Sequence, residues 1–315
     1  MTCNFCNLDC VKAGRYGIQK IQRYKCKSCG KRFSEAQEKP LGDVRLPDHK
    51  VSLILRCLVE GNSVRGTARL CDVEKRTVLR ILTLAGQNCE RLLERKICNV
   101  KVEDVQIDEA WTFVGKKERR KTRDDKGRTD IGDQFVYVAL EANSKMVLCW
   151  HLGRRDNPNT WDFITKLRDA TSSKRFQLTS DAFGAYRGAI NAGLHDRVDY
   201  AQQIKLYGSI PGGRDYYRPA KIKGTIKTVL NGRPQPGRIT TSHIERMNGS
   251  LRQWCKRMTR LTYAFSRKLE NLRASLALHF AYYNFCRVHS SLKVTRAMEN
   301  GVTDHIWSIE ELIAA

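Results

Sequence analysis

The sequence lacks any long apolar run and is short of acidic residues. No apolar stretch in its 315 residues approaches the ~18 residues that a membrane-spanning helix needs, so we expect no such helix. Its first residues, MTCNFC, contain no charged segment followed by an apolar one, so we expect no signal peptide. It also has no internal repeat and no long disordered tract. These absences favour a cytoplasmic chain with no membrane partner.

The shortage of acids makes the chain strongly basic. It has 57 Lys and Arg against 33 Asp and Glu, a formal net charge of +24. Such a surface usually binds a polyanion, of which nucleic acid is the commonest. An inert basic surface or a membrane-associated protein are the alternatives. The apolar fraction of 41% is enough for a core, and the length is typical of about two domains with small modules possible.

The twelve cysteines come without an export signal, which argues against a disulfide framework. Four of them form two Cys-x-x-Cys pairs, Cys3 with Cys6 and Cys26 with Cys29. Each pair points two thiolates at one ion, and four thiolates complete a tetrahedral Zn²⁺ site that can fold a very small segment. We expect a structural zinc module at 1–36. Four metal-free thiols or a redox pair are the alternatives, and Cys10 is a spare that could replace one ligand.

Residues 46–88 are predicted to form a helix-turn-helix DNA-binding domain. Apolar residues recur at helical spacing in three segments; Ser63 can cap the second, and 71–73 makes a turn before the third. The third helix has a basic outward face and would enter the major groove. Its expected DNA contacts are Lys75, Arg76, Thr77 and Arg80. An ordinary three-helix packing unit is the alternative.

After a helical linker at 87–101, the pattern becomes that of an α/β domain with a mixed sheet and flanking helices at 100–290. Strands are expected at 102–115, 134–142, 145–153, 175–181 and 198–204. A helix at 157–170 should turn Trp161, Ile164 and Leu167 inward. A C-terminal tail follows at 291–315.

Two basic insertions interrupt this domain. The first, at 116–128, is either a solvated hairpin tip or a DNA contact. The second, at 203–240, is predicted to be an irregular basic loop. Its aromatic residues could stack on unpaired bases, or it could be a plain surface loop.

Three acids are candidates for a catalytic site: Asp108, Asp181 and Glu245. The first two are expected at strand ends, where their carboxylates can meet if the strands are neighbours, and Glu245 lies early in an amphipathic helix. Three ionised carboxylates repel one another, and Mg²⁺ or Mn²⁺ relieves that repulsion. Two such ions about 4 Å apart can activate the attacking oxygen and stabilise the leaving oxygen at a phosphodiester.

Each acid also has a structural alternative. Asp108 could pair with an arginine, Asp181 could cap the next helix, and Glu245 fits an S-x-x-E capping box beginning at Ser242. The role of His243, beside this motif, is open. Helical spacing places a group of polar residues on one face, where a cation could hold a phosphate. These residues are Glu245, Asn248, Arg252 and Lys256.

With these motifs, the sequence resembles the insertion-sequence-1 family of DDE transposases. The runs QIDEAWTFVGKK, TSDAFGAY and SHIERMNGSLRQWCKRMTRLTYAFSRKLE carry the resemblance, which extends over nearly the whole chain. It implies an RNase H-like catalytic domain with Asp108, Asp181 and Glu245 as metal ligands. It also implies that Arg252 is the basic residue near the DNA end, and that the N-terminal modules bind the terminal inverted repeats of an element.

The resulting hypothesis is a DNA transposase. A metal-activated water would cut a phosphodiester at the element end, and the freed 3′-hydroxyl would attack target DNA. Two ends of the element must be held, so we expect at least a dimer. Its partner would be double-stranded DNA, and we expect the protein to associate with the nucleoid when it is bound to DNA. One alternative is a transcription regulator with an inactive RNase H-like domain, and another is an RNase H-like nuclease without joining activity. A regulator would have no reason to keep three converging carboxylates.

Overall fold

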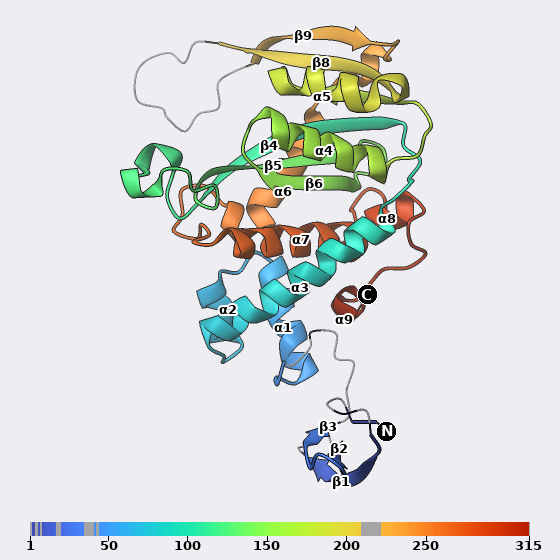
Figure 1. The fold of residues 1–315 in the computed structure, drawn as a ribbon. Helices are drawn as coiled ribbons and strands as arrows, with labels where there is room; N and C mark the ends of the chain where they lie inside the picture. The colour runs from blue at the N-terminus through green and yellow to red at the C-terminus, as the bar shows by residue number, and fades with distance from the viewer. Residues whose placement is uncertain are drawn as a thin grey trace. The chain divides into compact units, whose positions relative to one another are not determined.

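The chain divides into two compact units, Met1–Val44 and Arg45–Ala315, each of which is described by itself (Figure 1). The computed structural model describes residues 2–3, 6, 8–16, 20–34, 41, 44–208 and 222–314. Every helix within these ranges is too short or too polar to cross a lipid bilayer.

The N-terminal unit is a small antiparallel sheet. Its strands are β1 (Cys10–Tyr16), β2 (Ile21–Cys26) and β3 (Arg32–Ser34), in that order. Tyr24 stacks on Phe33 with ring centroids 6.0 Å apart, but most other strand side chains are exposed. The described residues of this unit bury little apolar surface, and a sheet of this size needs a further source of stability, such as a metal.

Three helices begin the second unit: α1 (Asp48–Val59), α2 (Val64–Leu70) and α3 (Lys75–Lys96). The prediction that Ser63 caps the second helix is confirmed, because its Oγ accepts a hydrogen bond from the Gly66 amide at 3.0 Å. The segment 87–96, expected to be a helical linker, is helical as predicted, but it continues α3 rather than forming a separate connection. Cys89, Leu92 and Leu93 keep that half of the helix buried.

The second half of α3 crosses α7 (Leu269–Phe285) at close range (Figure 1). A Cβ atom added to Gly86 would lie 2.5 Å from the Cα and Cβ of Ala274 and 2.6 Å from its carbonyl oxygen. The two helices therefore meet backbone to backbone. This packing joins the three-helix region to the sheet domain.

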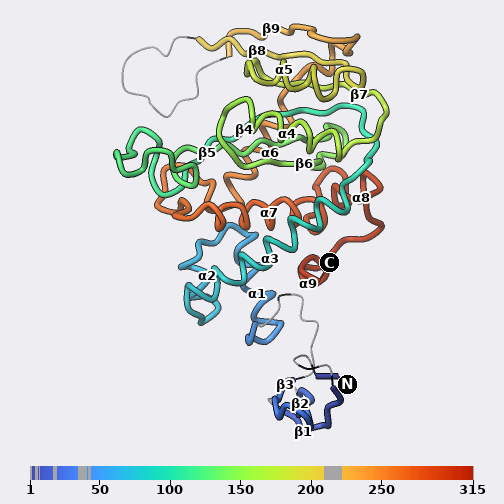
Figure 2. The backbone as a smooth tube through the Cα atoms, viewed as in Figure 1, coloured from blue at the N-terminus to red at the C-terminus, as the bar shows by residue number. Residues whose placement is uncertain are grey.

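The central sheet has six strands in the order β6-β5-β4-β7-β8-β9 (Figure 2). They are β4 (Asp104–Val114), β5 (Gly132–Glu141), β6 (Val147–Gly153), β7 (Phe176–Ser180), β8 (Val198–Tyr207) and β9 (Ile222–Asn231). Strands β4, β5 and β6 are antiparallel, β7 and β8 continue the sheet in parallel with β4, and β9 is antiparallel to β8. The predicted mixed α/β sheet is confirmed.

Strand β9 is a correction to the prediction of an irregular loop at 203–240. Residues 203–207 complete β8 and 222–231 form β9, while 209–221 lie outside the described residues. Side chains on both faces of β9 are exposed; Ile226 is 47% and Val229 52% exposed. Without a buried face the strand has no apolar alternation to mark it in the sequence.

Helices cover both faces of the sheet. Helix α4 (Asn157–Ala170) and α5 (Gly184–Leu194) pack together on one face, and α6 (Ser242–Trp254) packs on β4 and β5 from the other. The expectation that Trp161 turns inward is wrong, because it is 44% exposed and Phe163 occupies the inward position. The short helices α8 (Arg296–Glu299) and α9 (Ile309–Ala314) form the tail, and α9 packs against α1 and α3.

The charged insertion at 116–128 is a folded hairpin tip containing two short 3₁₀ turns. Asp125 accepts hydrogen bonds from the Lys116 ammonium at 2.6 Å and from the Thr122 amide at 2.9 Å. Glu118 pairs with Lys121 at 2.9 Å and with Arg154. Several cations stay exposed, namely Arg119, Arg120, Arg123 and Lys126. A DNA contact by this tip stays a prediction.

Asp104 gives the fold a pH-dependent stability. It is only 4% exposed and its Oδ1 lacks a hydrogen-bond partner among the described residues. Burial raises its pKa to about 6, above that of the unfolded chain. The folded state therefore holds this proton more tightly, and stability falls as the pH rises from about 4 to about 6.

We expect Asp104→Asn to remove that fall, leaving the variant more stable at pH 7 by at most about 3 kcal/mol. Urea unfolding at several pH values between 4 and 8 measures the effect. Parallel pH profiles for the variant and the wild type would contradict it.

Candidate active site

Strands β4 and β7 place the two predicted aspartates at one edge. Asp108 lies in the middle of β4 rather than at a strand end, which corrects the expectation. However, the pairing of β7 with β4 ends at Thr179, which lies opposite Gln106, so β4 continues past the end of β7. Asp181 follows the last residue of β7. Both side chains therefore lie beyond the carboxyl end of the same strand, where ligand sites of open α/β sheets form.

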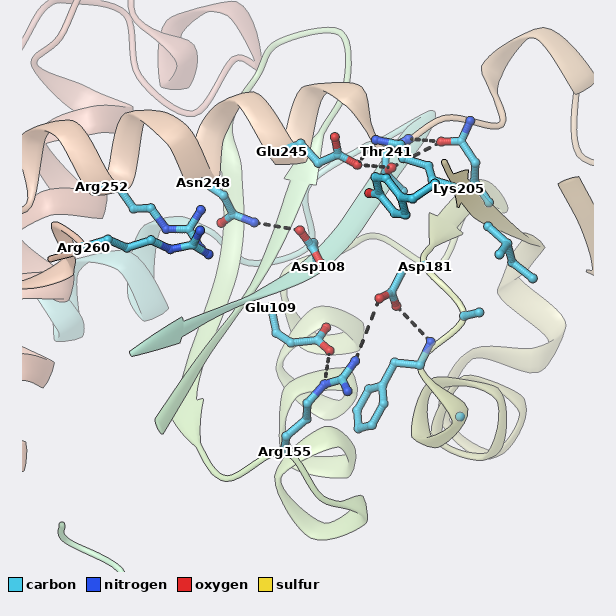
Figure 3. Close-up of a pocket in the computed structure, with 16 residues that line it drawn as sticks. Asp108, Glu109, Arg155, Asp181, Lys205, Thr241, Glu245, Asn248, Arg252 and Arg260 are labelled. Atoms are coloured by element: carbon cyan, nitrogen blue, oxygen red, sulfur yellow. Dashed lines mark hydrogen bonds and ion pairs between the residues drawn. The ribbon is translucent and has the colours of Figure 1, made fainter. Parts of the chain in front are cut away.

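A third carboxylate, from Glu109, joins them. Side-chain oxygens of Asp108, Glu109 and Asp181 all lie within 4.8 Å of one another. Adjacent residues of a strand point to opposite faces, so the sequence pattern predicts that Asp108 and Glu109 point apart. Asp181 lies beyond the end of β7, between the two faces, and approaches both (Figure 3). The paired acids in QIDEAW are the signal that could have identified Glu109.

Glu109 is held by neighbours that leave its carboxylate little freedom. Its side chain is only 3% exposed; Oε1 accepts from Arg155 Nε at 2.5 Å and Oε2 from the Tyr186 hydroxyl at 2.7 Å. The Arg155 guanidinium also lies 3.9 Å from Asp181 and 4.0 Å from the ring centroid of Phe183. Arg155 thus connects two acids of the cluster and partly offsets their charge.

The crowding opposes ionisation. Burial raises the pKa of Asp108 to about 7, and the charges of Glu109, Asp181 and Glu245 contribute to the rise. Burial also raises the pKa of Glu109, against the opposing effect of Tyr186 and Arg155. A bound cation would favour the ionised forms, and carboxyls perturbed in this way in a cleft are typical of functional sites.

Glu245 lies on the first turn of α6, apart from the three-acid cluster. Its Oε1 accepts from the Thr241 hydroxyl at 2.7 Å and from the Lys205 ammonium. Figure 3 shows the carboxylate turned toward these two residues, across the pocket from Asp108. The side chain is 44% exposed, so it has room to turn.

Glu245 is not a helix cap. Ser242 is the first residue of α6, and its amide donates to Thr240 Oγ1 at 3.2 Å rather than to Glu245. Gln106 of β4 satisfies the helix start instead, because its Oε1 accepts from the amides of His243 and Ile244 at 3.0 and 3.1 Å. The capping-box alternative is therefore wrong.

The acids line a cavity of about 810 Å³, and Arg252 and Arg260 line it to one side of Asp108 (Figure 3). Asn248 Nδ2 donates to Asp108 Oδ2 at 2.8 Å, and Arg252 lies one turn further along α6, beside Arg260. Burial and the charge of Arg260 lower the pKa of Arg252. In the described part of the chain neither guanidinium forms an ion pair, so both could bind a phosphate. Lys256 follows the end of α6 and does not line this cavity.

The four predicted zinc ligands lie together in the N-terminal unit. The Sγ atoms of Cys3 and Cys29 are 3.6 Å apart, those of Cys6 and Cys26 are 3.5 Å apart, and all four lie within 4.8 Å of one another. Tetrahedral Zn–S bonds of about 2.3 Å would place the sulfurs about 3.8 Å apart, so the thiols fit a zinc ion. The Cys29 amide donates to Cys26 Sγ and lowers the pKa of Cys26 to about 6. Cys10 is not one of the four.

The predicted DNA contacts of the three-helix region lie at the start of α3. Lys75, Arg76 and Arg80 are exposed, and Thr77 is half-buried. Helices α2 and α3 are joined by a short turn in which Asp72 has a φ of 48°. These cations are accessible to a DNA groove, and their role there stays a prediction.

No protein-family profile and no curated protein sequence matches this chain. Among solved structures it is similar to the piggyBac transposase in a synaptic complex with hairpin DNA, at a TM-score of 0.40 and 11% identity over 88% of this chain and 71% of that one. It is also similar to a pre-cleavage Mos1 transpososome, at a TM-score of 0.21 and 13% identity over 53% of this chain and 62% of that one. Similarity this weak does not establish a family.

Proposed function

We propose that this chain is a DNA transposase of an insertion sequence, which cuts and joins phosphodiester bonds at the acid cavity. The observation that carries the proposal is the meeting of Asp108 and Asp181, 73 residues apart in the chain, in a wide cavity that arginines also line. The strand order of the mixed sheet is compatible with an RNase H-like domain. The high net charge of +24 supports DNA as the partner.

The carboxylate oxygens in the cavity suit Mg²⁺ or Mn²⁺. Asp108 and Asp181 would hold the ions, and Glu245 would reach them from α6 by turning away from Thr241 and Lys205. Glu109 would support the site rather than bind a metal ion, because Arg155 and Tyr186 already donate hydrogen bonds to its two carboxylate oxygens. Two bound ions would activate the attacking oxygen and stabilise the leaving one.

The protein's own side chains hold the substrate and the acids in place. Asn248 fixes one oxygen of Asp108, and Arg155 restrains Asp181 beside Glu109. Arg252 and Arg260 line the cavity beside Asn248 and would bind the phosphates that flank the cut. Charges fixed before DNA binds need not reorganise during the reaction.

The remaining parts of the chain would recognise DNA. The zinc module at 1–36 and the helix-turn-helix at 46–88 would bind the terminal inverted repeats, beside a catalytic domain at 100–290 and a tail at 291–315. Base-edge contacts would come from the start of α3 in the major groove. Transposition requires two element ends to be held together, so the active form would be at least a dimer.

The test uses the purified chain, Mg²⁺ or Mn²⁺, and labelled duplexes carrying the DNA that flanks the gene. We expect one strand to be cut at the element end and its 3′-hydroxyl to be joined to a target plasmid. Cutting without joining would instead indicate a nuclease. Sequence-specific binding with neither reaction would indicate a transcription regulator.

Zinc content tests the N-terminal module. We expect one Zn²⁺ per wild-type chain, and its loss in Cys26→Ser, because three thiolates cannot close the site. Cys10→Ser is the matched control and should keep the metal. Mass spectrometry of the metal content reads both variants, and zinc retained at full occupancy in Cys26→Ser would contradict the assignment.

A further inference from the structure

A second cavity, of about 600 Å³, lies against α6 away from the acid cluster. Positively charged or basic side chains from several elements line it, and none of its lining residues is an aspartate or a glutamate. These basic side chains are Lys145, His243, Arg246, His289 and Arg296. We refer to this cavity as the basic pocket.

Helix α6 presents a different face to each cavity. Glu245, Asn248 and Arg252 line the acid cavity (Figure 3). His243, Arg246 and Ser250 line the basic pocket. With 3.6 residues per turn, these two sets lie on nearly opposite sides of the helix. One helix therefore separates the acid cavity from the basic pocket.

The basic pocket is built from well-fixed parts. Arg296 is 7% exposed, donates to the carbonyls of Tyr283 and Arg287 at 3.0 and 3.1 Å, and lies over the Tyr283 ring. Lys145, in the turn between β5 and β6, has its Nζ 3.5 Å from His243 Nε2. The pocket thus brings cations from three separate segments to one place.

Among the described residues that line the pocket beside Lys145, Arg246 and Arg296, none carries a carboxylate. Two acids lie near Lys145 without lining the pocket, namely Glu141 and Asp104. Both are buried, at 2% and 4% exposed, and Glu141 accepts from the hydroxyl of Ser144 at 2.8 Å. Because no acid lines the pocket itself, the cations that line it repel one another, at a free-energy cost that a bound anion would lower.

The pKa values of the two histidines are lowered in part by the positive charges of the pocket. Burial and the charges of Lys145 and Arg246 lower the pKa of His243. Burial and the charges of Arg296, Lys145 and Arg246 lower the pKa of His289. Two neutral imidazoles and nearby serine hydroxyls can then donate hydrogen bonds while the lysine and arginines supply the charge. This donor set suits a phosphate group.

We propose that the basic pocket binds a phosphodiester of the DNA strand that is not cut in the acid cavity. This assignment rests on the proposed function. A helix with its side chains is about 10–12 Å across, and the major groove of DNA is about 12 Å wide. If α6 lies in the major groove, the phosphate backbones of the two DNA strands that border the groove can therefore contact opposite sides of this helix. The basic pocket would hold the register of the duplex while the other strand reacts.

The test measures DNA affinity against salt concentration for the full chain carrying Asp108→Asn, with a fluorescent duplex of the gene's flanking DNA. The slope of log affinity against log salt is negative. Adding Arg246→Gln and Lys145→Gln should make it less steep, by about 2, and should weaken binding about tenfold at moderate salt. Lys174→Gln is the charge control, because this exposed residue precedes β7 at the end of the strand away from Asp181. It should leave the slope unchanged.

An unchanged slope in the Arg246→Gln and Lys145→Gln protein would overturn the proposal, provided that thermal melts show an intact fold. Stabilisation of the wild type by inorganic phosphate, lost in this variant without a change of slope, would show a free-anion site and overturn it too. The outcome is separable from the proposed function. Cutting by the wild type with an unchanged slope refutes the pocket alone, whereas a less steep slope with no cutting by any form refutes the transposase alone.

Discussion

Asp108→Asn is expected to abolish DNA cutting, by about 1,000-fold or more, with DNA binding kept. The amide has the shape of the carboxylate, and its oxygen can still accept from Asn248, so the local packing survives. The change removes the charge of a metal ligand, whose loss withdraws several kcal/mol of transition-state stabilisation. Gel assays of strand cutting, with fluorescence anisotropy for binding, measure the two effects.

The same variant should be more stable than the wild type. Burial raises the pKa of Asp108 to about 7, so the folded state loses stability as the pH rises from about 4 to about 7. Without divalent ions at pH 8, Asp108→Asn should gain a few kcal/mol in its free energy of unfolding. Lost cutting together with gained stability distinguishes a removed ligand from a damaged fold. Asp162→Asn, at an exposed position of α4, is the control and should change neither.

Gly86→Ala is expected to destabilise the second unit by about 2–4 kcal/mol. Alanine normally favours a helix over glycine by about 1 kcal/mol. Here the added methyl would meet the Ala274 backbone at 2.5 Å, so α3 and α7 would have to move apart, which is the cost of overpacking a core. Chemical denaturation followed by circular dichroism measures the loss.

Gly188→Ala in α5 is the matched control. Nothing lies within 4 Å of a Cβ at that position, so the variant should be as stable as the wild type or up to about 1 kcal/mol more stable. Equal stabilities of Gly86→Ala and the wild type would contradict the close helix crossing. The crossing is what makes the three-helix region and the sheet domain one unit.

Local sequence patterns predicted most of the fold. The strands and helix α4 carry apolar side chains at regular spacing, and Asp156 caps α4 by accepting from the Asn159 amide at 3.0 Å. Each of these signals depends on a few neighbouring residues, so it can be recognised without knowing which distant parts of the chain the segment contacts. The mixed sheet followed from the order of such segments.

The errors arose where distant contacts decide the outcome. Strand β9 is held by its hydrogen bonds to β8 rather than by a buried face, so its side chains show no alternation. The second half of α3 is fixed by contact with α7, nearly 200 residues later in the chain. Trp161 has the spacing of an inward residue, but Phe163 and Ile164 already fill the space beneath α4.

The candidate site shows the same division. The short motifs identified Asp108 and Asp181, but only the end of β7 explains how they meet. Glu109 was missed because alternation along a strand predicts that it points away from Asp108, whereas their side-chain oxygens lie within 4.8 Å of each other and of Asp181. Glu245 had a plausible capping role, which Gln106 performs instead from a strand far away in sequence.

The central claim is that Asp108 and Asp181 bind the divalent ions that cut DNA. The most direct measurement is calorimetric titration of Mn²⁺ into the zinc-loaded chain bound to duplex DNA. We predict saturable Mn²⁺ binding that is lost in the Asp108→Asn and Asp181→Asn double variant and kept in Asp162→Asn. Mn²⁺ binding of the same affinity and stoichiometry in the double variant would contradict the claim.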